Sequence, residues 1–193
     1  MNTENDTNAY DNGLVIEGLM GIQPLERFLQ ALADAALEMT RAAGVGLTIE
    51  GASRPLTVIS AGAAALSLDE KQYGQNDGPR LHGARTGEEV VVDDMLTETR
   101  WGDYPAYAAA TGIHSCGSFP LSTDHGGTAG ALNVYGQALH AFVAMDFQLL
   151  RSLAPRASGA ITRTQRLVIS EQLATQSRRR LPPAPSSTRP WAW

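Results

Sequence analysis

The chain has 193 residues, a formal net charge of −5 and 43% hydrophobic residues, which suits one globular domain with a sizeable core. Its single cysteine, Cys116, excludes an internal disulfide and a thiolate-bound metal, and its four histidines are far apart, so neither a metal nor another cofactor is expected. No segment approaches the roughly eighteen uninterrupted apolar residues of a transmembrane helix, and the first residues lack the basic and apolar regions of a signal peptide. We therefore expect a cytoplasmic protein without a membrane partner.

The charge is unevenly distributed along the chain. Four arginines and no acidic residue fall within residues 178–193, and subtracting them from the total leaves −9 for residues 1–177. An acidic body repels phosphate backbones. The Arg178–Arg180 triplet, with Trp191 and Trp193, has basic and aromatic side chains but no fold to position them. We expect no specific nucleic-acid binding by this chain.

The N-terminal part predicts one long helix and a β-hairpin. Residues 1–13 are rich in Asn, Asp and Thr, which is typical of a disordered tail. Apolar residues recur at helical spacing over 24–43, and Gly44 is the expected end of that helix. Alternating apolar residues over 45–51 and 56–61 predict the two strands of the hairpin.

The rest of the chain predicts short helices, more strands and one long helix. Short helices are expected over 63–74, 80–87 and 105–111, and strands over 88–95, 113–122 and 128–136. From Met145 onward the pattern is helical, and Pro155 should kink or divide this helix because it removes an amide donor. Consecutive hairpins, with long helices at both ends of the chain, predict an α+β fold around a central antiparallel sheet.

A longer pattern covers residues 69–136. It contains "QYGQNDGP", then "RTGEEVVVDD", then "RW" before a helix that ends at Gly112, and finally "S…FPL" and "GALNVY". Each element alone is weak, but their order and spacing over some seventy residues resemble a GAF domain. More narrowly, the stretch resembles the GAF domains that precede an ANTAR RNA-binding module in bacterial signalling and antitermination regulators.

The resemblance implies a fold and a function. The fold is a GAF-like antiparallel sheet with the N- and C-terminal helices on one face, and with short helices and loops that form a ligand pocket on the other. The function is a non-enzymatic, small-molecule-sensing and dimerising regulatory domain in signal transduction or transcription regulation, with an unknown effector. One alternative is a structural interaction domain whose own side chains fill the pocket. A remote alternative is the GAF-fold reductase of free methionine sulfoxide, which requires a nucleophilic cysteine and a resolving partner.

On the GAF layout the candidate ligand-binding residues combine aromatic walls with a few polar groups, as small-ligand sites require. These residues are Tyr73, Asp77, Trp101, Tyr104, Ser115, Ser118, Asn133 and Tyr135. The competing interpretation is structural: Trp101 would anchor its helix to the sheet, and Tyr135 would face outward from its strand.

Several residues invite a chemical role. Many relatives have cysteine after the Gly-Pro, whereas this chain has Arg80, so thiol-based sensing at that position is lost. His114 is a conceivable haem ligand, and Cys116 a conceivable redox sensor, but a structural role is favoured for both. Asp93 and Asp94 are adjacent, and on a strand they would point to opposite faces, so they are expected to end a strand rather than bind an ion.

The terminal helix is expected to make a homodimer. Apolar or small residues recur every three or four positions after Pro155, and the interface residues expected are Ile161, Thr164, Leu167 and Val168. The competing interpretation is that this stripe covers the domain's own sheet. The expected boundaries are therefore a tail at 1–13, the GAF-like domain at 14–177 and an Arg/Pro-rich disordered tail at 178–193. In the relatives the ANTAR bundle follows, so the last segment is interpreted as a truncated or frameshifted output module, or as a natural tail.

Overall fold

A computed structural model describes residues 22–49, 56–123 and 127–180. It contains five antiparallel strands in one sheet, in the order β2-β1-β5-β4-β3. The strands are β1 (Gly44–Ile49), β2 (Leu56–Gly62), β3 (Val90–Val92), β4 (Ser115–Ser122) and β5 (Thr128–Gly136). The helices are α2 (Gln23–Thr40), α3 (Ala65–Gln75), α4 (Pro79–Thr86), α5 (Tyr104–Ala110) and α6 (Ala144–Arg180).

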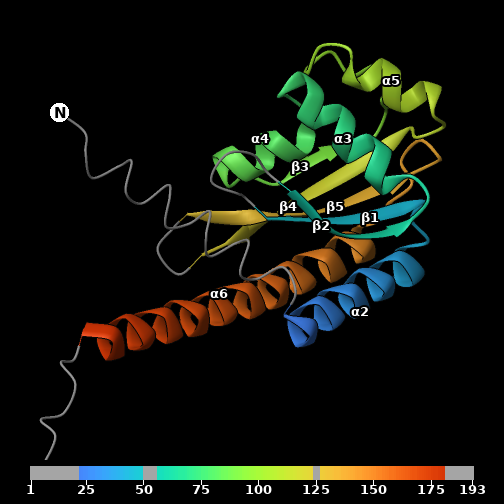
Figure 1. The fold of residues 1–193 in the computed structure, drawn as a ribbon. Helices are drawn as coiled ribbons and strands as arrows, with labels where there is room; N and C mark the ends of the chain where they lie inside the picture. The colour runs from blue at the N-terminus through green and yellow to red at the C-terminus, as the bar shows by residue number, and fades with distance from the viewer. Residues whose placement is uncertain (1–21, 50–55, 124–126, 181–193) are drawn as a thin grey trace, which may run out of the picture.

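The helices cover the two faces of the sheet unequally. Helices α2 and α6 lie side by side on one face, and the shorter α3, α4 and α5 lie on the other (Figure 1). This arrangement confirms the expected α+β fold, including both hairpins and the pairing of the two terminal helices. Within the described ranges, no helix combines the length and apolar character that crossing a bilayer requires.

Each face of the sheet has its own apolar core, because side chains alternate along a strand. Toward α2 and α6, Leu47 of β1 lies beside Leu132 of β5, which in turn lies beside Phe119 of β4. Toward the short helices, Cys116 of β4 lies beside Tyr135 of β5. One strand therefore contacts both helical layers through alternate residues.

Helix α2 ends earlier than the sequence suggested. It begins with Pro24 in its first turn and buries Leu25, Leu29 and Leu32 at helical spacing. It ends at Thr40, where Arg41 takes the left-handed conformation with φ 52°, and Gly44 is instead the first residue of β1. The early end frees the backbone to join the sheet, where the Ala43 amide donates to the Tyr135 carbonyl.

Helix α6 is not divided at Pro155, although the sequence allowed that outcome. Proline leaves the carbonyl four residues earlier, on Arg151, without its helical donor. Both residues are exposed, so water can supply the missing hydrogen bond on the solvent side. The helix continues through Arg180, three residues past the boundary expected at 177. The N-terminal tail at 1–13 and the rest of the expected C-terminal tail, 181–193, lie outside the described residues.

Candidate functional site

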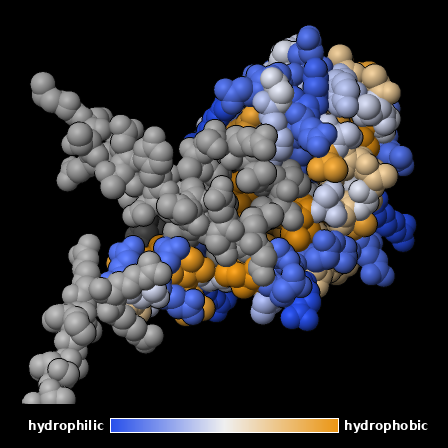
Figure 2. Space-filling model, viewed as in Figure 1, coloured by the Kyte–Doolittle hydropathy of each residue, from blue (hydrophilic) through white to orange (hydrophobic). Residues whose placement is uncertain are grey.

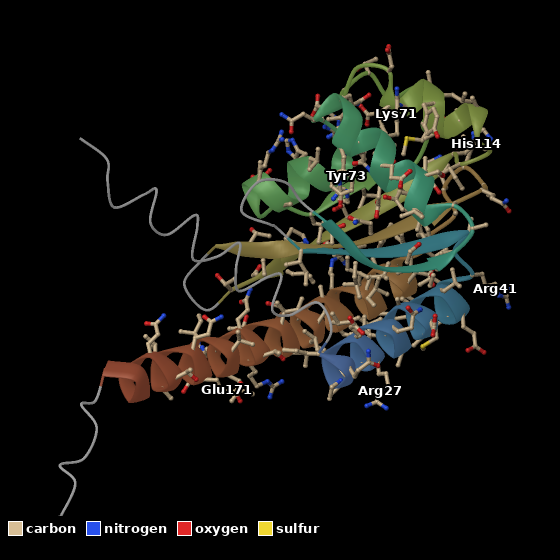
Figure 3. All side chains as sticks on the ribbon, viewed as in Figure 1. Arg27, Arg41, Lys71, Tyr73, His114 and Glu171 are labelled. Atoms are coloured by element: carbon tan, nitrogen blue, oxygen red, sulfur yellow. The ribbon has the colours of Figure 1, made fainter. Side chains whose placement is uncertain are left out.

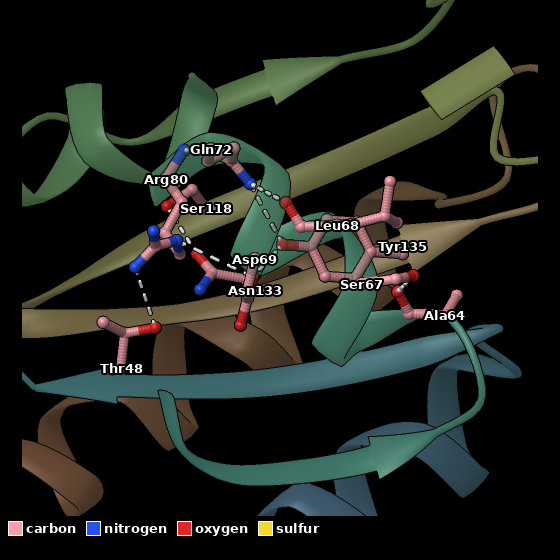
Figure 4. A network of polar contacts seen from close by, with 10 residues as sticks. All are labelled: Thr48, Ala64, Ser67, Leu68, Asp69, Gln72, Arg80, Ser118, Asn133 and Tyr135. Carbon is pink, nitrogen blue, oxygen red and sulfur yellow. Dashed lines mark hydrogen bonds and ion pairs between the residues drawn. The ribbon is translucent and has the colours of Figure 1, made fainter. Parts of the chain in front are cut away.

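A layer of polar side chains is buried between the sheet and helices α3 and α4. Seven polar residues there are each at most 1% exposed. Together we call them the buried polar cluster: Thr48, Asp69, Gln72, Arg80, Ser118, Asn133 and Tyr135 (Figure 4). Polar groups buried this deeply destabilise a protein unless they are hydrogen-bonded.

The strands supply the floor of the cluster. Ser118 of β4 is the direct partner of Asn133 of β5, which is the partner of Gly46 of β1. The Ser118 hydroxyl donates to Oδ1 of Asn133 at 2.8 Å, which leaves the Asn133 amide nitrogen as a free donor. Gly46 leaves room for α3: a Cβ there would lie 2.7 Å from Oδ2 of Asp69. The missing side chain thus lets a carboxylate sit directly on the sheet.

Helix α3 supplies an acid and an amide to the cluster. Its buried face consists of Ala65, Leu68, Asp69 and Gln72, which recur at helical spacing. Asp69 accepts a hydrogen bond from the Tyr135 hydroxyl, and the Gln72 amide nitrogen donates to the same hydroxyl at 3.3 Å. Burial raises the pKa of Tyr135 well above its ordinary value, and the charge of Asp69 raises it further. Tyr135 is therefore a neutral donor at physiological pH.

Arg80, the second residue of α4, sits at the centre of the cluster. Its Nη1 donates to Oγ1 of Thr48 at 3.2 Å, and its Nε lies 3.6 Å from Oδ1 of Asp69. Its guanidinium carbon stacks on the half-buried ring of Tyr73, 3.9 Å from the ring centroid. Its backbone amide donates to Oε1 of Gln72 at 3.0 Å. Arg80 thus joins α3, α4 and β1.

The turn between α3 and α4 fixes the approach of Arg80 and requires a glycine. Gly78 has φ 147°, and a Cβ there would lie 2.3 Å from Oε1 of Gln72, the atom that holds the Arg80 amide. Asp77 is exposed and its Oδ1 accepts a hydrogen bond from the Gly78 amide at 2.9 Å. Asp77, a sequence candidate for ligand binding, therefore shapes this turn at the surface.

Several buried donors in this region have no hydrogen-bond partner among the described residues. They are Nε and Nη2 of Arg80 and Nδ2 of Asn133. The hydroxyl of the buried Tyr104 lies beside that of Tyr135. An unpaired buried donor costs about 1–3 kcal/mol. Groups of this kind are what a bound ligand with acceptor oxygens would satisfy.

The structure brings five of the eight sequence candidates together and separates three. The residues within or against the cluster are Tyr73, Tyr104, Ser118, Asn133 and Tyr135. Asp77 is at the surface turn, and Trp101 is 6% exposed in the apolar core below α5, where its carbonyl accepts from the Gln75 amide. Ser115 lies on the opposite face of the sheet, beside Phe142, because it is an odd number of positions from Ser118.

Sequence reasoning missed four members of the cluster: Thr48, Asp69, Gln72 and Arg80. A signal for two of them was present. Asp69 and Gln72 fall on the same helical stripe as Ala65 and Leu68, and a polar pair on an apolar stripe indicates a buried polar contact. In the sequence Arg80 differs from many relatives only as the replacement of a cysteine, and nothing in the local sequence pairs it with Asp69.

The structure supports structural roles for the other residues that the sequence suggested as reactive. Cys116 is 1% exposed, and burial raises the pKa of its thiol well above the ordinary value. His114 is half-buried at the end of the sheet near α5 (Figure 3). Asp94 accepts from the Leu96 amide in the turn after β3, as expected of a strand end. Among the described residues, no three metal-ligating side chains converge.

Two grooves open on the described surface away from the cluster. One, of about 540 Å³, lies where α2 ends and α6 begins, beside Arg41 and Asp146. The other, of about 420 Å³, lies between α3 and α5, beside Lys71 and Tyr107. Neither of these two grooves is lined by a residue of the buried polar cluster.

The expected dimer residues divide into two groups. Ile161 is 0% exposed in the core beneath α2 and α6, so it covers the domain's own sheet and adds nothing to an outer surface. Thr164 and Val168 are half-buried, and Leu167 is 65% exposed. Every described side chain from Ile169 to Gln176 is exposed, so α6 overruns the sheet there, where Figure 3 labels Glu171.

Comparisons with known proteins agree with this architecture. A family model described as GAF domain matches residues 23–162. Similar solved structures include a domain of a protein assigned as a two-component sensor histidine kinase of Sinorhizobium meliloti 1021, at 17% identity and TM-score 0.59, covering 81% of this chain and 97% of that one. A GAF domain of Synechocystis sp. PCC6803 in its photoproduct state is 17% identical with TM-score 0.60, covering 75% of this chain and 97% of that one.

A third similar structure is an enzyme, the free methionine-R-sulfoxide reductase of Neisseria meningitidis in complex with its substrate. It is 19% identical with TM-score 0.59, covering 75% of this chain and 81% of that one. At these identities the likeness concerns the fold alone. A search of the curated proteins gives no match. Because the family model spans well over half of the chain, and the sheet and its two helical layers have the expected layout, the chain belongs to the GAF domain family.

Proposed function

We propose that this GAF domain is a non-enzymatic sensor that works in the cytoplasm as a homodimer and binds a small molecule between the sheet and the α3–α4 layer. The buried polar cluster carries the proposal. A buried ion pair is weak support for stability, because apolar residues of similar size often fold at least as well. A cluster that keeps an Arg80–Asp69 pair and unpaired donors in a core position is better explained by a ligand.

The strands offer a route from the cluster to α6. Asn133 and Tyr135 face the cluster, and the alternate residues Leu132 and Val134 pack in the core shared with α2 and α6. A shift of β5 on ligand binding would therefore reach both layers. Helix α6 would carry the change to an output module.

Dimerisation is supported by the overhanging part of α6, residues 169–176, and by the neighbouring Leu167. Leu167, Ile169 and Leu173 are 65%, 42% and 58% exposed, and Figure 2 shows apolar surface along this helix. Ile169 and Leu173 are four residues apart and share a face, whereas Leu167 projects from another side. A helix end without tertiary contacts is marginal in water, so apolar residues on two of its sides favour a second copy as its neighbour.

The non-enzymatic part of the proposal rests on Cys116. The reductase in the Neisseria structure shows that this fold can support redox catalysis. Reductase chemistry of that kind needs a thiolate nucleophile and a resolving thiol. Cys116 is 1% exposed, its pKa is raised by burial, and it is the only cysteine in the sequence. The same features support a reducing compartment, where no disulfide is required.

A second candidate function is a structural interaction domain that binds no ligand. One observation favours it: Arg80, Tyr104 and Tyr135 are fully buried and fill the space between the sheet and the short helices with the domain's own side chains. In that case the unpaired donors would be satisfied by ordered water.

Ligand screening by thermal stability separates the two functions. A ligand present at a hundred times its Kd stabilises a domain by about 2.7 kcal/mol, a readily measured shift in Tm. We expect at least one member of a metabolite library to raise the Tm of the wild-type protein, and native mass spectrometry to show one ligand per chain. A matched control is Lys71→Gln, outside the cluster, which should respond as the wild type does. A library without any hit, together with ligand-free protein from the cell, would favour the structural domain.

The finer resemblance, to GAF domains that precede ANTAR modules, belongs to the proposal as well. It is supported by "RLVISEQLATQSR" at 166–178, which includes the overhanging part of α6 and lies where the relatives continue toward their RNA-binding bundle. The coding sequence that follows Trp193 tests it. A reading frame there that encodes a helical bundle of ANTAR character would support regulation of transcription through RNA.

A further inference from the structure

The unpaired donors of the buried polar cluster indicate what kind of ligand group it takes. Arginine carries five N–H donors in a planar fork. In Arg80, Nη1 is held by Thr48, Nε has only a 3.6 Å ion pair with Asp69, and Nη2 has no partner among the described residues. The Asn133 amide nitrogen is a further donor without a described partner. All three atoms need an acceptor.

The two side chains lie over the same part of the sheet. Thr48, which holds Arg80, is on β1 opposite Ala131, two residues along β5 from Asn133. Figure 4 shows the Arg80 guanidinium between the α3–α4 layer and the strands that carry Thr48 and Asn133. The Asn133 amide is oriented by Ser118, whose hydroxyl donates to its oxygen and so fixes its nitrogen as the free end.

We propose that Arg80 and Asn133 form a subsite for a carboxylate or phosphate group of the ligand, and that Asp69 is a built-in competitor for the same guanidinium. The inference rests on the proposed sensory function. A planar fork of donors matches the oxygens of these two anions. The contact between Arg80 Nε and Asp69 Oδ1, at 3.6 Å, is longer than a hydrogen bond. An oxyanion of the ligand can therefore accept hydrogen bonds from Nε and Nη2 and replace the ion pair with Asp69.

Tyr73 lies against the subsite. Its ring is half-buried and stacked against the guanidinium, which is itself 1% exposed. Tyr73 and Asp69 are on the same helix, α3, and Arg80 is on α4. Pairing of a ligand with Arg80 would release Asp69, so binding would loosen the contact between the two helices.

Calorimetric titrations of the full chain with three probes test the subsite. The probes are succinate, inorganic phosphate and succinamide, the last being an uncharged match for succinate. We expect succinate or phosphate to bind and succinamide to bind at least about tenfold more weakly, because charged hydrogen bonds are roughly twice as strong as neutral ones. The stronger of the two anions identifies the class of the ligand group. Equal binding of succinate and succinamide, or binding by none of the three, would overturn the inference.

Two variants then locate the binding. Asp69→Asn removes the competing charge, and should tighten oxyanion binding about tenfold, whereas Arg80→Gln should weaken it about tenfold or more. If Arg80→Gln does not fold, Asn133→Asp replaces it as the test. This variant places a permanent carboxylate of the protein beside Arg80, so it should abolish oxyanion binding while the protein stays folded. Weaker binding by Asp69→Asn, or unchanged binding by Asn133→Asp, would contradict the inference.

The outcome for the proposed function can be told apart from the outcome for the subsite. If a neutral metabolite from the library stabilises the domain and the oxyanions do not bind, the sensor survives and the oxyanion subsite is wrong. If no library member and no oxyanion binds, the proposed sensory function and the oxyanion subsite are both wrong.

Discussion

Tyr135 is the residue that joins the two halves of the buried polar cluster. Its hydroxyl donates to Asp69 and accepts from Gln72, so Tyr135→Phe leaves a buried carboxylate without one of its donors. We expect the free energy of unfolding to fall by about 1–3 kcal/mol, the cost of an unsatisfied buried group. Urea unfolding followed by circular dichroism measures it.

Tyr107→Phe is the matched control for that substitution. Tyr107 is half-buried on α5, and its ring, which faces Lys71, is retained by phenylalanine. The control should stay within about 0.5 kcal/mol of the wild type. If both variants unfold at the same urea concentration, the hydrogen bonds of Tyr135 do not contribute to stability.

Buried phenols and the buried thiol also predict how stability depends on alkaline pH. Burial raises the pKa of Tyr104, Tyr135 and Cys116 in the folded protein. Unfolded, these groups ionise near their ordinary values of about 8.5 for cysteine and about 10 for tyrosine. Above those values the unfolded chain binds fewer protons than the folded one, so the free energy of unfolding falls as pH rises.

The stabilisation is fully present below about pH 8, and each group should add about 1.4 kcal/mol per pH unit to the decline once its unfolded form is ionised. Denaturant titrations at intervals from pH 8 to pH 11 give the slope. A variant with Tyr104→Phe and Cys116→Ser should show a shallower decline than the wild type. Identical slopes would mean that other groups dominate the alkaline transition.

At the scale of the element, α6 is continuous although it has a proline in its interior. Pro155 is exposed, and its ring removes one helical hydrogen bond from the Arg151 carbonyl. We expect Pro155→Ala to raise the free energy of unfolding by about 1–3 kcal/mol, since proline is the poorest residue in a helix interior. Chemical denaturation measures the change.

Arg156→Ala, the next position and also exposed, is the control, and it should change stability little because arginine and alanine are both good helix formers. A loss of stability in Pro155→Ala would show instead that the sheet requires a bend in α6. In that case the buried neighbours Ala154 and Ala157 would be the contacts that a straighter helix disturbs.

At the scale of the whole molecule, the overhanging part of α6 predicts the oligomeric state. Light scattering after size exclusion should give about twice the chain mass of 20.6 kDa. Ile169→Glu with Leu173→Glu should shift the protein toward the monomer, because both would place charges in an apolar interface. Leu167→Glu tests the other side of the helix, where Leu167 is exposed.

Ser170→Glu with Gln172→Glu adds the same charge at exposed polar positions of the same segment and should leave the dimer intact. A wild-type protein that stays monomeric at high micromolar concentration would remove dimerisation from the proposed function. Dissociation by the control pair as well would show that net charge, rather than apolar contact, sets the association.

The sequence by itself determined the elements and the family. Period-two and helical patterns placed the strands, their hairpins and the terminal helices, because each pattern reflects one buried face of a local element. The same alternation already separates Ser115 from Ser118, so that part of the site could have been corrected without coordinates. Helix ends were less well determined: α2 ends at Thr40, because the backbone turns at Arg41 and the Ala43 amide then bonds to the sheet, which the local pattern does not report.

Only the tertiary structure decided which polar residues meet. Asp69 and Arg80 are on different helices, and their pairing depends on the turn at Gly78 and on the space left by Gly46 of β1. Burial within α6 was likewise a tertiary outcome: Ile161 packs in the core, whereas Ile169 lies past the edge of the sheet. Local patterns report which face of an element is apolar, but the partner of a charge depends on how separate elements come together in space.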